Sequence, residues 1–388
     1  MECDLLIIGG GASGLSAAIT AARLCPKAKI IIAEKNKRVG KKLAVTGNGR
    51  CNISNSDLDA CHYHGDRDFA AKALKNFSFD DTVKFFDSLG VIIKTEDDGR
   101  AYPYCLQAAS VVDTLRFECD RLKIITLTEF EITGIKHSNN KFYCSGADKI
   151  TAKSVIFAAG GCAGGSLYGT DGSAYSLLNG VHNVIEPKPV IVQLKTENSV
   201  TKRLKGIKIN ADVNIGGHSC YGEVLFCDYG LSGPAVMQLS RYAQAGSTVS
   251  LDIMPEYSEA EVHELLKKRL TLNRQDDEFF TGLLNKRLGQ TIAAVCGGVK
   301  NLPLLAKTIK SLEFKVTGNM GFKNAQATAG GFDTNEFELN MSSKKIPGLF
   351  CCGEALNVDG DCGGYNLQWA FCSAFIAAKA ASEFLLIK

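Results

Sequence analysis

The sequence predicts an α/β protein in which a parallel-sheet domain is joined to a β-rich domain, and three patterns predict it. Residues 3–33 consist of two short apolar runs separated by a stretch whose apolar residues recur at helical spacing, as in a strand–helix–strand unit. A further apolar run, residues 154–161, ends in a second glycine turn, which is typical of a buried parallel strand. Beyond Pro187 and Pro189, "KGIKINADVNIGG" and "STVSLDIMP" alternate like antiparallel strands.

The composition is that of a globular chain of two to three domains. It has 388 residues, of which 45% are hydrophobic and 22% are charged, with 44 Lys and Arg against 41 Asp and Glu. The resulting net charge of +3 is too small to indicate a nucleic-acid or anionic-membrane partner. Glycine is frequent, with 39 residues against only 8 prolines, which indicates backbone packed closely against another group.

Cysteine usage and the N-terminus indicate the compartment. The chain has 15 cysteines but no CxxC pair, so the spacing predicts no metal site. Several cysteines, such as Cys351, Cys352 and Cys372, lie in apolar stretches, as is common in a reducing cytosol. Glu2 and Asp4 stand where a signal peptide carries Lys or Arg, and no apolar run approaches 18 residues. We therefore expect a cytoplasmic protein that neither spans nor binds a membrane.

The first strand–helix–strand unit carries a dinucleotide-binding pattern. Gly9 permits a tight turn, Gly11 lets a pyrophosphate approach the backbone, and Gly14 allows the helix to pack on the strand. The helix N-terminus supplies amide donors, and Glu34 at the end of the second strand can accept both ribose hydroxyls. A carboxylate there repels a 2′-phosphate, so the pattern favours FAD or NAD over NADP. The alternatives are a structural glycine turn and a Glu34 that pairs with a neighbouring lysine.

The segment at residues 35–55 favours FAD over NAD. It holds three glycines and has five Lys or Arg among its first eight residues, where an NAD dehydrogenase would continue into another strand–helix unit. A solvated basic loop is the alternative, but it does not account for the run TGNGRCN. Cys51 lies in this run beside Arg50, which could make the thiol redox-active or a flavin attachment site by lowering its pKa. We favour a simpler interpretation, in which the backbone that wraps the cofactor requires a small side chain there.

The C-terminal segment contains the third nucleotide signal. A short apolar strand, Leu349 to Cys352, is followed by Gly353, Glu354 and a Gly/Asp loop. A helix then begins near Gly364, with apolar residues at steps of three and four. A helix N-terminus is a favourable place for the flavin edge that becomes anionic on reduction, although a glycine loop that only caps the helix remains the alternative.

The expected site residues lie in these glycine turns, in the basic segment and at the strand ends. We expect cofactor contacts at Gly9, Gly11, Ala12, Ser13, Gly14, Glu34, Lys35, Lys42, Asn48, Gly49, Arg50, Cys51, Ile132, Ala159, Gly160, Gly353, Glu354, Gly364, Asn366 and Leu367. Tyr365, Tyr102 and Arg100 are the candidates for polarising a substrate or donating a proton, with a structural role as the alternative for each.

Together, "DLLIIGGGASGLSAA", "GKKLAVTGNGRCNISN", "GEVLFCDYGLSGPAVMQLS", "AQATAGG" and "GLFCCGEALNVDGDCGGYNLQWAF" resemble the YhiN/BaiN-like flavoprotein family almost from end to end. The resemblance implies one non-covalent FAD in a discontinuous Rossmann-type domain, residues 1–188 and 323–388. It also implies an inserted β-barrel-like domain, residues 189–255 and 311–322, and a small helical domain, residues 256–310. Residues 164–175 and 100–108 depart from the family pattern where they are expected to border the substrate pocket.

Relatives in that family include bile-acid enone reductases and aminoacetone oxidases. The resemblance therefore implies an FAD-dependent oxidoreductase, in which NAD(P)H is a transient co-substrate and a hydride passes through flavin N5 to a small enone-like acceptor. A flavin-dependent amine or aminoketone oxidase is the alternative, because the same motifs serve both directions. An RNA-modifying flavoprotein is a third possibility, which the near-neutral charge disfavours. We expect a small-molecule substrate and no nucleic-acid partner.

Overall fold

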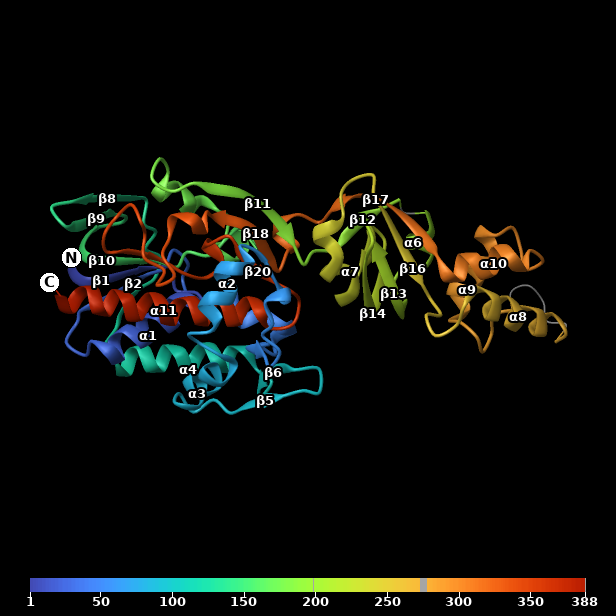
Figure 1. Ribbon diagram of the computed structural model, residues 1–388, viewed down its shortest axis with the longest axis horizontal. Coiled ribbons are helices and arrows are strands. Elements are labelled where there is room, and N and C mark those ends of the chain that lie inside the picture. The colour runs from blue at the N-terminus through green and yellow to red at the C-terminus, as the bar shows by residue number, and fades with distance from the viewer. Residues whose placement is uncertain (198, 273–277, 388) are drawn as a thin grey trace. The chain divides into compact units, whose positions relative to one another are not determined.

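The computed structural model describes residues 1–197, 199–272 and 278–387. The chain divides into two compact units (Figure 1). The first comprises Met1–Pro189 and Gln326–Lys388, and the second comprises Val190–Ala325.

The first unit is built on a seven-stranded sheet of order β7-β2-β1-β10-β9-β8, with β19 paired to β10. The strands are β1 (Glu2–Ile8), β2 (Ile30–Ala33), β7 (Ile125–Leu127), β8 (Gly134–Ser138), β9 (Lys141–Ser145), β10 (Lys149–Phe157) and β19 (Leu349–Cys351). The pairs among β7, β2, β1, β10 and β19 are parallel, whereas β8, β9 and β10 form antiparallel pairs. Strands β2 and β19 and most of β1 are buried, as is typical of apolar parallel strands covered on both faces, whereas the edge strand β7 is partly exposed. Their carboxyl ends lie together at one edge of the sheet.

Helices cover this sheet. Helix α1 (Ala12–Leu24) contacts both α4 (Ala108–Arg121) and α11 (Tyr365–Ile387), and α11 also contacts β10 (Figure 1). The remaining elements of this unit are β3 (Ser54–Asn55), β4 (Tyr63–Gly65), α2 (Arg67–Leu74), α3 (Phe79–Asp87), β5 (Ile93–Thr95), β6 (Arg100–Pro103), α5 (Gly165–Tyr168), β11 (Val184–Val190), β18 (Ala327–Phe332) and β20 (Val358–Gly360). The strands among these elements form three small sheets, of order β3-β6-β5, β20-β4 and β11-β18.

The second unit is a closed barrel of order β12-β15-β14-β13-β16-β17 with a helical insertion. The barrel elements are β12 (Leu194–Thr196), α6 (Ser199–Arg203), β13 (Lys208–Ile215), β14 (His218–Cys227), β15 (Gly230–Ser232), α7 (Pro234–Gln238), β16 (Thr248–Asp252) and β17 (Leu312–Asn319). Helices α8 (Glu259–Leu270), α9 (Lys286–Val295) and α10 (Leu302–Lys310) lie between β16 and β17 in the chain. Barrel and helices share one core, which includes Phe226, Val262 and Ile292. The predicted fold class, a Rossmann-type domain with an inserted barrel and a helical part, is confirmed.

The sequence patterns predict a helix from Ser110 to Arg121 with Ser110 as its cap, a strand from Ile124 to Gly134 and a helical stretch from Phe279 to Leu312. The structure corrects each of these at its ends. Helix α4 begins at Ala108, so Ser110 is inside the helix and does not cap it. The expected strand from Ile124 is limited to β7, because Glu129 at φ +54° takes the chain out of the sheet. The helical stretch predicted from Phe279 to Leu312 is broken between α9 and α10, where Gly297 adopts φ +74°.

Helix α11 is a further difference from the sequence-based expectation. It is the one helix in the described residues that is long and apolar enough to cross a membrane. Most of the qualifying stretch, 61%, is buried inside the protein. A helix packed against α1 and β10 has the same composition as a spanning helix because both are surrounded by apolar groups.

Candidate active site

The three motif glycines meet different surroundings in the turn between β1 and α1. A Cβ on Gly9, which has φ +104°, would lie 2.5 Å from the carbonyl oxygen of Ala158, and one on Gly14 would lie 1.9 Å from the carbonyl oxygen of Gly9. A Cβ on Gly11 would have no described atom within 4 Å apart from its chain neighbours. Gly9 and Gly14 are therefore required for packing, whereas Gly11 borders open space at the N-terminus of α1. No described side chain caps that terminus, so its first amides are available to an anion.

Glu34 is buried at the end of β2 and is fixed by three donors. Its Oε2 accepts the Gly10 N–H at 2.8 Å, and its Oε1 accepts the Asn36 N–H at 2.8 Å and Nδ2 at 2.6 Å. The alternative interpretation, in which Glu34 pairs with a neighbouring lysine, is wrong, because Lys35 forms an ion pair with Asp171 at 2.9 Å instead. Glu34 thus anchors the glycine turn. A carboxylate oxygen can accept more than one hydrogen bond, so it can still accept ribose hydroxyls.

The C-terminal turn at Gly353 lies against the glycine motif. A Cβ on Gly353 would be 2.7 Å from Ser13 Oγ, so the turns after β1 and β19 meet. Helix α11 holds this glycine from two sides: Ser373 Oγ accepts its N–H at 2.8 Å, and Trp369 Nε1 donates to its carbonyl oxygen at 3.0 Å. The adjacent Glu354 forms an ion pair with Lys42 at 2.6 Å.

The loop after β10 completes this group of strand ends. Ala159 lies directly behind Gly9, since the Gly9 Cβ would be 2.9 Å from its Cα. Gly160 follows at φ +77°. Thr328 Oγ1 accepts the N–H groups of Cys162 and Ala163 at 2.9 and 2.8 Å and so fixes the chain after this turn. Ile132 is buried two residues after Phe130, whose N–H donates to the Glu34 carbonyl oxygen.

The TGNGRCN run is held in an unusual backbone conformation. Asn48, Gly49 and Cys51 have φ values of +56°, +82° and +63°. Asn48 is exposed, whereas Cys51 is fully buried, and burial raises the pKa of its thiol to about 12. Asn52 Oδ1 is buried and has no hydrogen-bond partner among the described residues, close to where a Cβ on Gly364 would stand (2.8 Å).

The three candidate catalytic residues lie near the start of α11. The pKa of Tyr365 is raised, first by burial and then by Asp57 and Asp361, while the positive charge of Arg100 opposes the rise. Arg100 also acts on the pKa of Tyr102, which burial raises. The Arg50 guanidinium lies 4.7 Å above the Tyr102 ring. Arg50, Arg100, Tyr102 and Tyr365 are thus near one another.

Asn366 and Leu367 differ in what they do at the first turn of α11. The Asn366 side chain accepts the Gly360 N–H at 2.9 Å and donates to the Gly360 carbonyl oxygen at 2.8 Å. It therefore closes the preceding loop. Leu367 is half-buried on the same turn.

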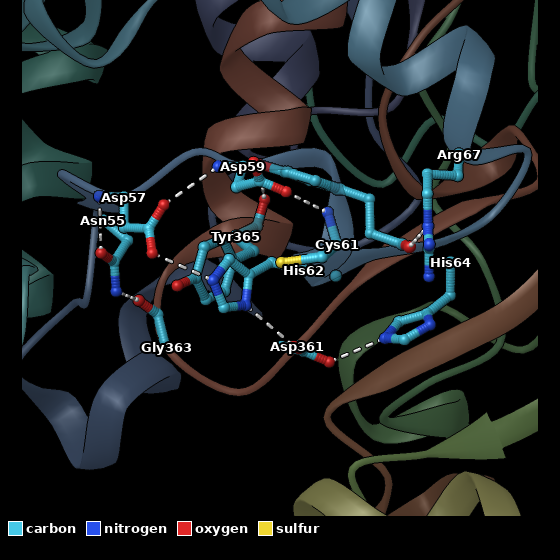
Figure 2. A network of polar contacts seen from close by, with 12 residues as sticks. Asn55, Asp57, Asp59, Cys61, His62, His64, Arg67, Asp361, Gly363 and Tyr365 are labelled. Atoms are coloured by element: carbon cyan, nitrogen blue, oxygen red, sulfur yellow. Dashed lines mark hydrogen bonds and ion pairs between the residues drawn. The ribbon is translucent and has the colours of Figure 1, made fainter.

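A polar network that the sequence analysis did not single out lies against Tyr365 (Figure 2). His62 lies between Asp57 and Asp361, and His64 also contacts Asp361. Its signal in the sequence is the pattern "HYH", which sets two imidazoles two residues apart, but the partner Asp361 is 299 residues from His62. Among the described residues, no group of three or more His, Cys, Asp or Glu side chains could hold a metal ion.

The residues at the glycine turns fit a dinucleotide. Open space at Gly11, an uncapped helix N-terminus and an anchored carboxylate at the end of β2 are what an adenosine diphosphate group requires. At α11, the unpartnered Asn52 Oδ1 is an acceptor for a ring N–H group, as on a flavin.

The family match decides the identity of the chain. Residues 3–380 match the HI0933-like protein Rossmann domain. The chain belongs to this family. It is 36% identical to the 3-dehydro-bile acid delta(4,6)-reductase of Clostridium scindens over 97% of this chain and 98% of the relative. It is 29% identical to the ribosomal RNA dihydrouridine synthase of Haemophilus influenzae, again over 97% and 98%.

A solved structure extends the likeness of this family member to the fold. The 3-ketosteroid-delta4-(5alpha)-dehydrogenase of Rhodococcus jostii RHA1 covers 98% of this chain and 97% of its own, with a TM-score of 0.55 and 14% identity. The chain therefore has the fold of FAD-type oxidoreductases.

Proposed function

We propose that the protein is an FAD-dependent reductase that saturates a carbon–carbon double bond conjugated to a carbonyl group, with NAD(P)H as the transient reductant. The observation that carries this proposal is the 36% identity, over 97% of the chain, to 3-dehydro-bile acid delta(4,6)-reductase. The compound in that name has such a conjugated system. No disulfide bond joins cysteines within the part of the chain that the structure describes, which is in keeping with a cytoplasmic site of action.

The chain's part in the reaction begins with binding. We assign the diphosphate to the N-terminus of α1 beside Gly11, the adenosine ribose to Glu34, and the ring system to the start of α11 near Gly364 and Asn52. A flavin held by these residues would supply the transfer of a hydride from NAD(P)H to the substrate. The sequence has one dinucleotide motif, so the nicotinamide docks only transiently.

Polarisation of the substrate is the second part. Because burial raises the pKa of Tyr365, its phenol stays protonated at neutral pH and can donate a hydrogen bond to the substrate carbonyl oxygen. The positive charge of Arg100 stabilises the negative charge that develops on that oxygen. Each double bond consumes one NAD(P)H and one proton: the hydride adds to the carbon β to the carbonyl, and the proton adds to the α carbon.

A second candidate substrate is a uracil base in ribosomal RNA. The chain is 29% and 26% identical to the ribosomal RNA dihydrouridine synthases of Haemophilus influenzae and Escherichia coli. The double bond of uracil is also conjugated to a carbonyl, so the chemistry would be the same. We favour a small molecule without a nucleic-acid or membrane partner, because a net charge of +3 offers little attraction for an RNA backbone.

The test is an anaerobic titration of the purified holoprotein with NADH and with NADPH, followed by addition of an oxidant. We expect either nicotinamide to bleach the flavin, and a 3-oxo-Δ4,6-steroid to restore its colour. No bleaching with either nicotinamide contradicts the proposal. Return of colour with an unmodified ribosomal RNA transcript, but not with the steroid, selects the second candidate. Fast reoxidation by air after reduction by an amine instead identifies an oxidase.

A further inference from the structure

The His62 imidazole faces a carboxylate oxygen at each of its two ring nitrogens (Figure 2). Nδ1 lies 3.1 Å from Asp361 Oδ2, and Nε2 lies 3.2 Å from Asp57 Oδ2. Both ring nitrogens are thus within hydrogen-bond distance of a carboxylate, so the imidazole is held from two sides.

Asp361 links this ring to a second histidine and to the loop that begins α11. Its Oδ1 lies 2.7 Å from His64 Nε2, so one carboxylate serves two imidazoles. The Asp361 side chain is only 17% exposed, which limits the screening of these contacts by water. Asp361 lies four residues before Tyr365, so its contacts with His62 and His64 fix the loop that leads into α11. Asn366 fixes the same loop at Gly360.

The same imidazole also touches Tyr365 directly. The two rings are stacked, with centroids 4.5 Å apart and planes at 17°. The edge of Tyr63 lies against the Tyr365 ring at 5.9 Å and 85°. His62 therefore determines the orientation of the Tyr365 ring both by stacking and through the loop.

We propose that His62, held between Asp57 and Asp361 and stacked on the Tyr365 ring, is a positioning residue for Tyr365. The role in the reaction rests on the proposed function, in which Tyr365 meets the substrate carbonyl. The titratable and charged groups near His62 are Asp57, Asp59, Cys61, His64, Arg67, Arg100, Asp361 and Tyr365.

The experiment compares the holoprotein with His62→Gln and with a matched control, His137→Gln. His137 also packs against an aromatic ring, that of Phe142 at 4.7 Å, but lies on β8 at the far edge of the sheet. We expect His62→Gln to lower kcat on the order of 10-fold to 100-fold, as a misplaced catalytic group does. We also expect KM and the FAD dissociation constant to stay nearly unchanged, because His62 orients Tyr365 and does not itself bind the substrate or the cofactor. His137→Gln should keep the wild-type kcat.

A second measurement needs no substrate. Proton NMR of the holoprotein should show the Tyr365 ring resonances shifted in His62→Gln, because the stacked imidazole is lost, and unshifted in His137→Gln. Tyr365 resonances that stay in place in His62→Gln, or a His62→Gln enzyme with the kcat of the control, overturn the proposal. A wild-type protein that reduces no enone contradicts the proposed function but leaves this measurement valid.

A milder variant covers the case in which His62→Gln does not fold. The Asp57 side chain is 65% exposed, so Asp57→Asn removes one carboxylate charge with little effect on packing. This variant should lower kcat in the same direction as His62→Gln but by less, because Asp361 still holds the ring at Nδ1. A kcat equal to that of the wild type would contradict the proposal.

Discussion

Lys42 and Glu354 form an ion pair of 2.6 Å although 312 residues separate them in the chain. Lys42 follows β2, and Glu354 follows β19. The other oxygen of Glu354 accepts a hydrogen bond at 2.7 Å from the N–H of Thr328, which lies in β18. One carboxylate therefore joins three segments at the carboxyl edge of the parallel sheet, where doubly wound α/β proteins bind their ligands.

We expect Glu354→Gln to weaken FAD binding about tenfold, because one charge-assisted hydrogen bond contributes roughly 1.5–3 kcal/mol and ~1.4 kcal/mol corresponds to a factor of ten. The amide keeps the shape of the side chain but loses the charge. Flavin fluorescence on dilution measures the dissociation constant. The control is Asp228→Asn, which removes an exposed pair with Lys205 in the barrel unit. Equal FAD affinity in both variants would contradict a role for the Lys42–Glu354 pair in the site.

Gly11→Ala should weaken FAD binding without loss of stability, whereas Gly14→Ala should lower the stability of the protein. The Gly11 Cβ enters open space at φ −80°, which alanine adopts readily, so the apoprotein should keep its melting temperature but lose FAD affinity. The Gly14 Cβ would lie 1.9 Å from the Gly9 carbonyl oxygen, so the turn must distort and the melting temperature should fall. Calorimetry of the apoproteins and a flavin titration separate the two. Normal FAD binding by Gly11→Ala would show that the diphosphate lies elsewhere.

The sequence predicted those features of the site that depend on neighbours along the chain. The strand–turn–helix unit around Gly9 and the apolar periodicity of α11 are local, and both are present. The ends of the elements were harder, because a positive φ at Glu129 ends a strand without any glycine to signal it.

Partners distant in sequence could not be predicted. Lys42 and Glu354 were each expected at the cofactor, but nothing in the sequence indicates that they neutralise each other. Asp361 pairs with His62 across 299 residues, and Thr328 binds the loop after β10 across 166. Such pairings depend on tertiary packing, which the local patterns of a single sequence do not reveal.

Glu34→Ala should lower FAD affinity by on the order of 10²-fold or more, because the ribose would lose two charge-assisted hydrogen bonds of up to roughly 1.5–3 kcal/mol each. The structure adds a second cause, since the Gly10 N–H and Asn36 lose their acceptor as well. At saturating FAD, kcat should hardly change, because the chemistry takes place at the other end of the cofactor. The control is Asn36→Ala, which removes the side-chain donor to Glu34 but leaves the carboxylate in place. An unchanged dissociation constant for Glu34→Ala would remove the assignment of the ribose to this carboxylate.

Cys51→Ser should bind FAD and turn over normally. The thiol is fully buried, and its pKa of about 12 keeps it protonated despite the neighbouring Arg50, so it is not a nucleophile at neutral pH. Iodoacetamide at pH 8 should modify the exposed Cys105 and leave Cys51 intact, as peptide mass spectrometry would show. A more than tenfold loss of kcat in Cys51→Ser at unchanged FAD content would instead indicate a redox role.

His182 is a buried histidine whose neighbours determine which ring nitrogen carries the proton. Ser343 Oγ accepts the N–H groups of Lys345 and Ile346 at 3.0 and 2.9 Å, which leaves its own O–H to donate to His182 Nε2 at 2.9 Å. Nδ1 therefore carries the proton and donates to Glu336 at 2.9 Å. Burial lowers the pKa of His182 below 6.5, although Glu336 opposes the shift.

The stability of the first unit should therefore fall as the pH decreases below about 6.5. The unfolded chain binds a proton at His182 more readily than the folded one, so the stabilisation is complete above the unfolded pKa and is lost as the pH falls through the folded value. Glu336 contributes only at lower pH: burial raises its pKa, but hydrogen bonds from Lys345, the Asn183 N–H and His182 outweigh this and hold the pKa below 4.5. Melting temperatures between pH 8 and pH 5 should decline less in His182→Gln than in wild type. The control is His263→Gln, which changes a partly exposed histidine on α8. An equal decline in His182→Gln and wild type would show that His182 is not the group that titrates.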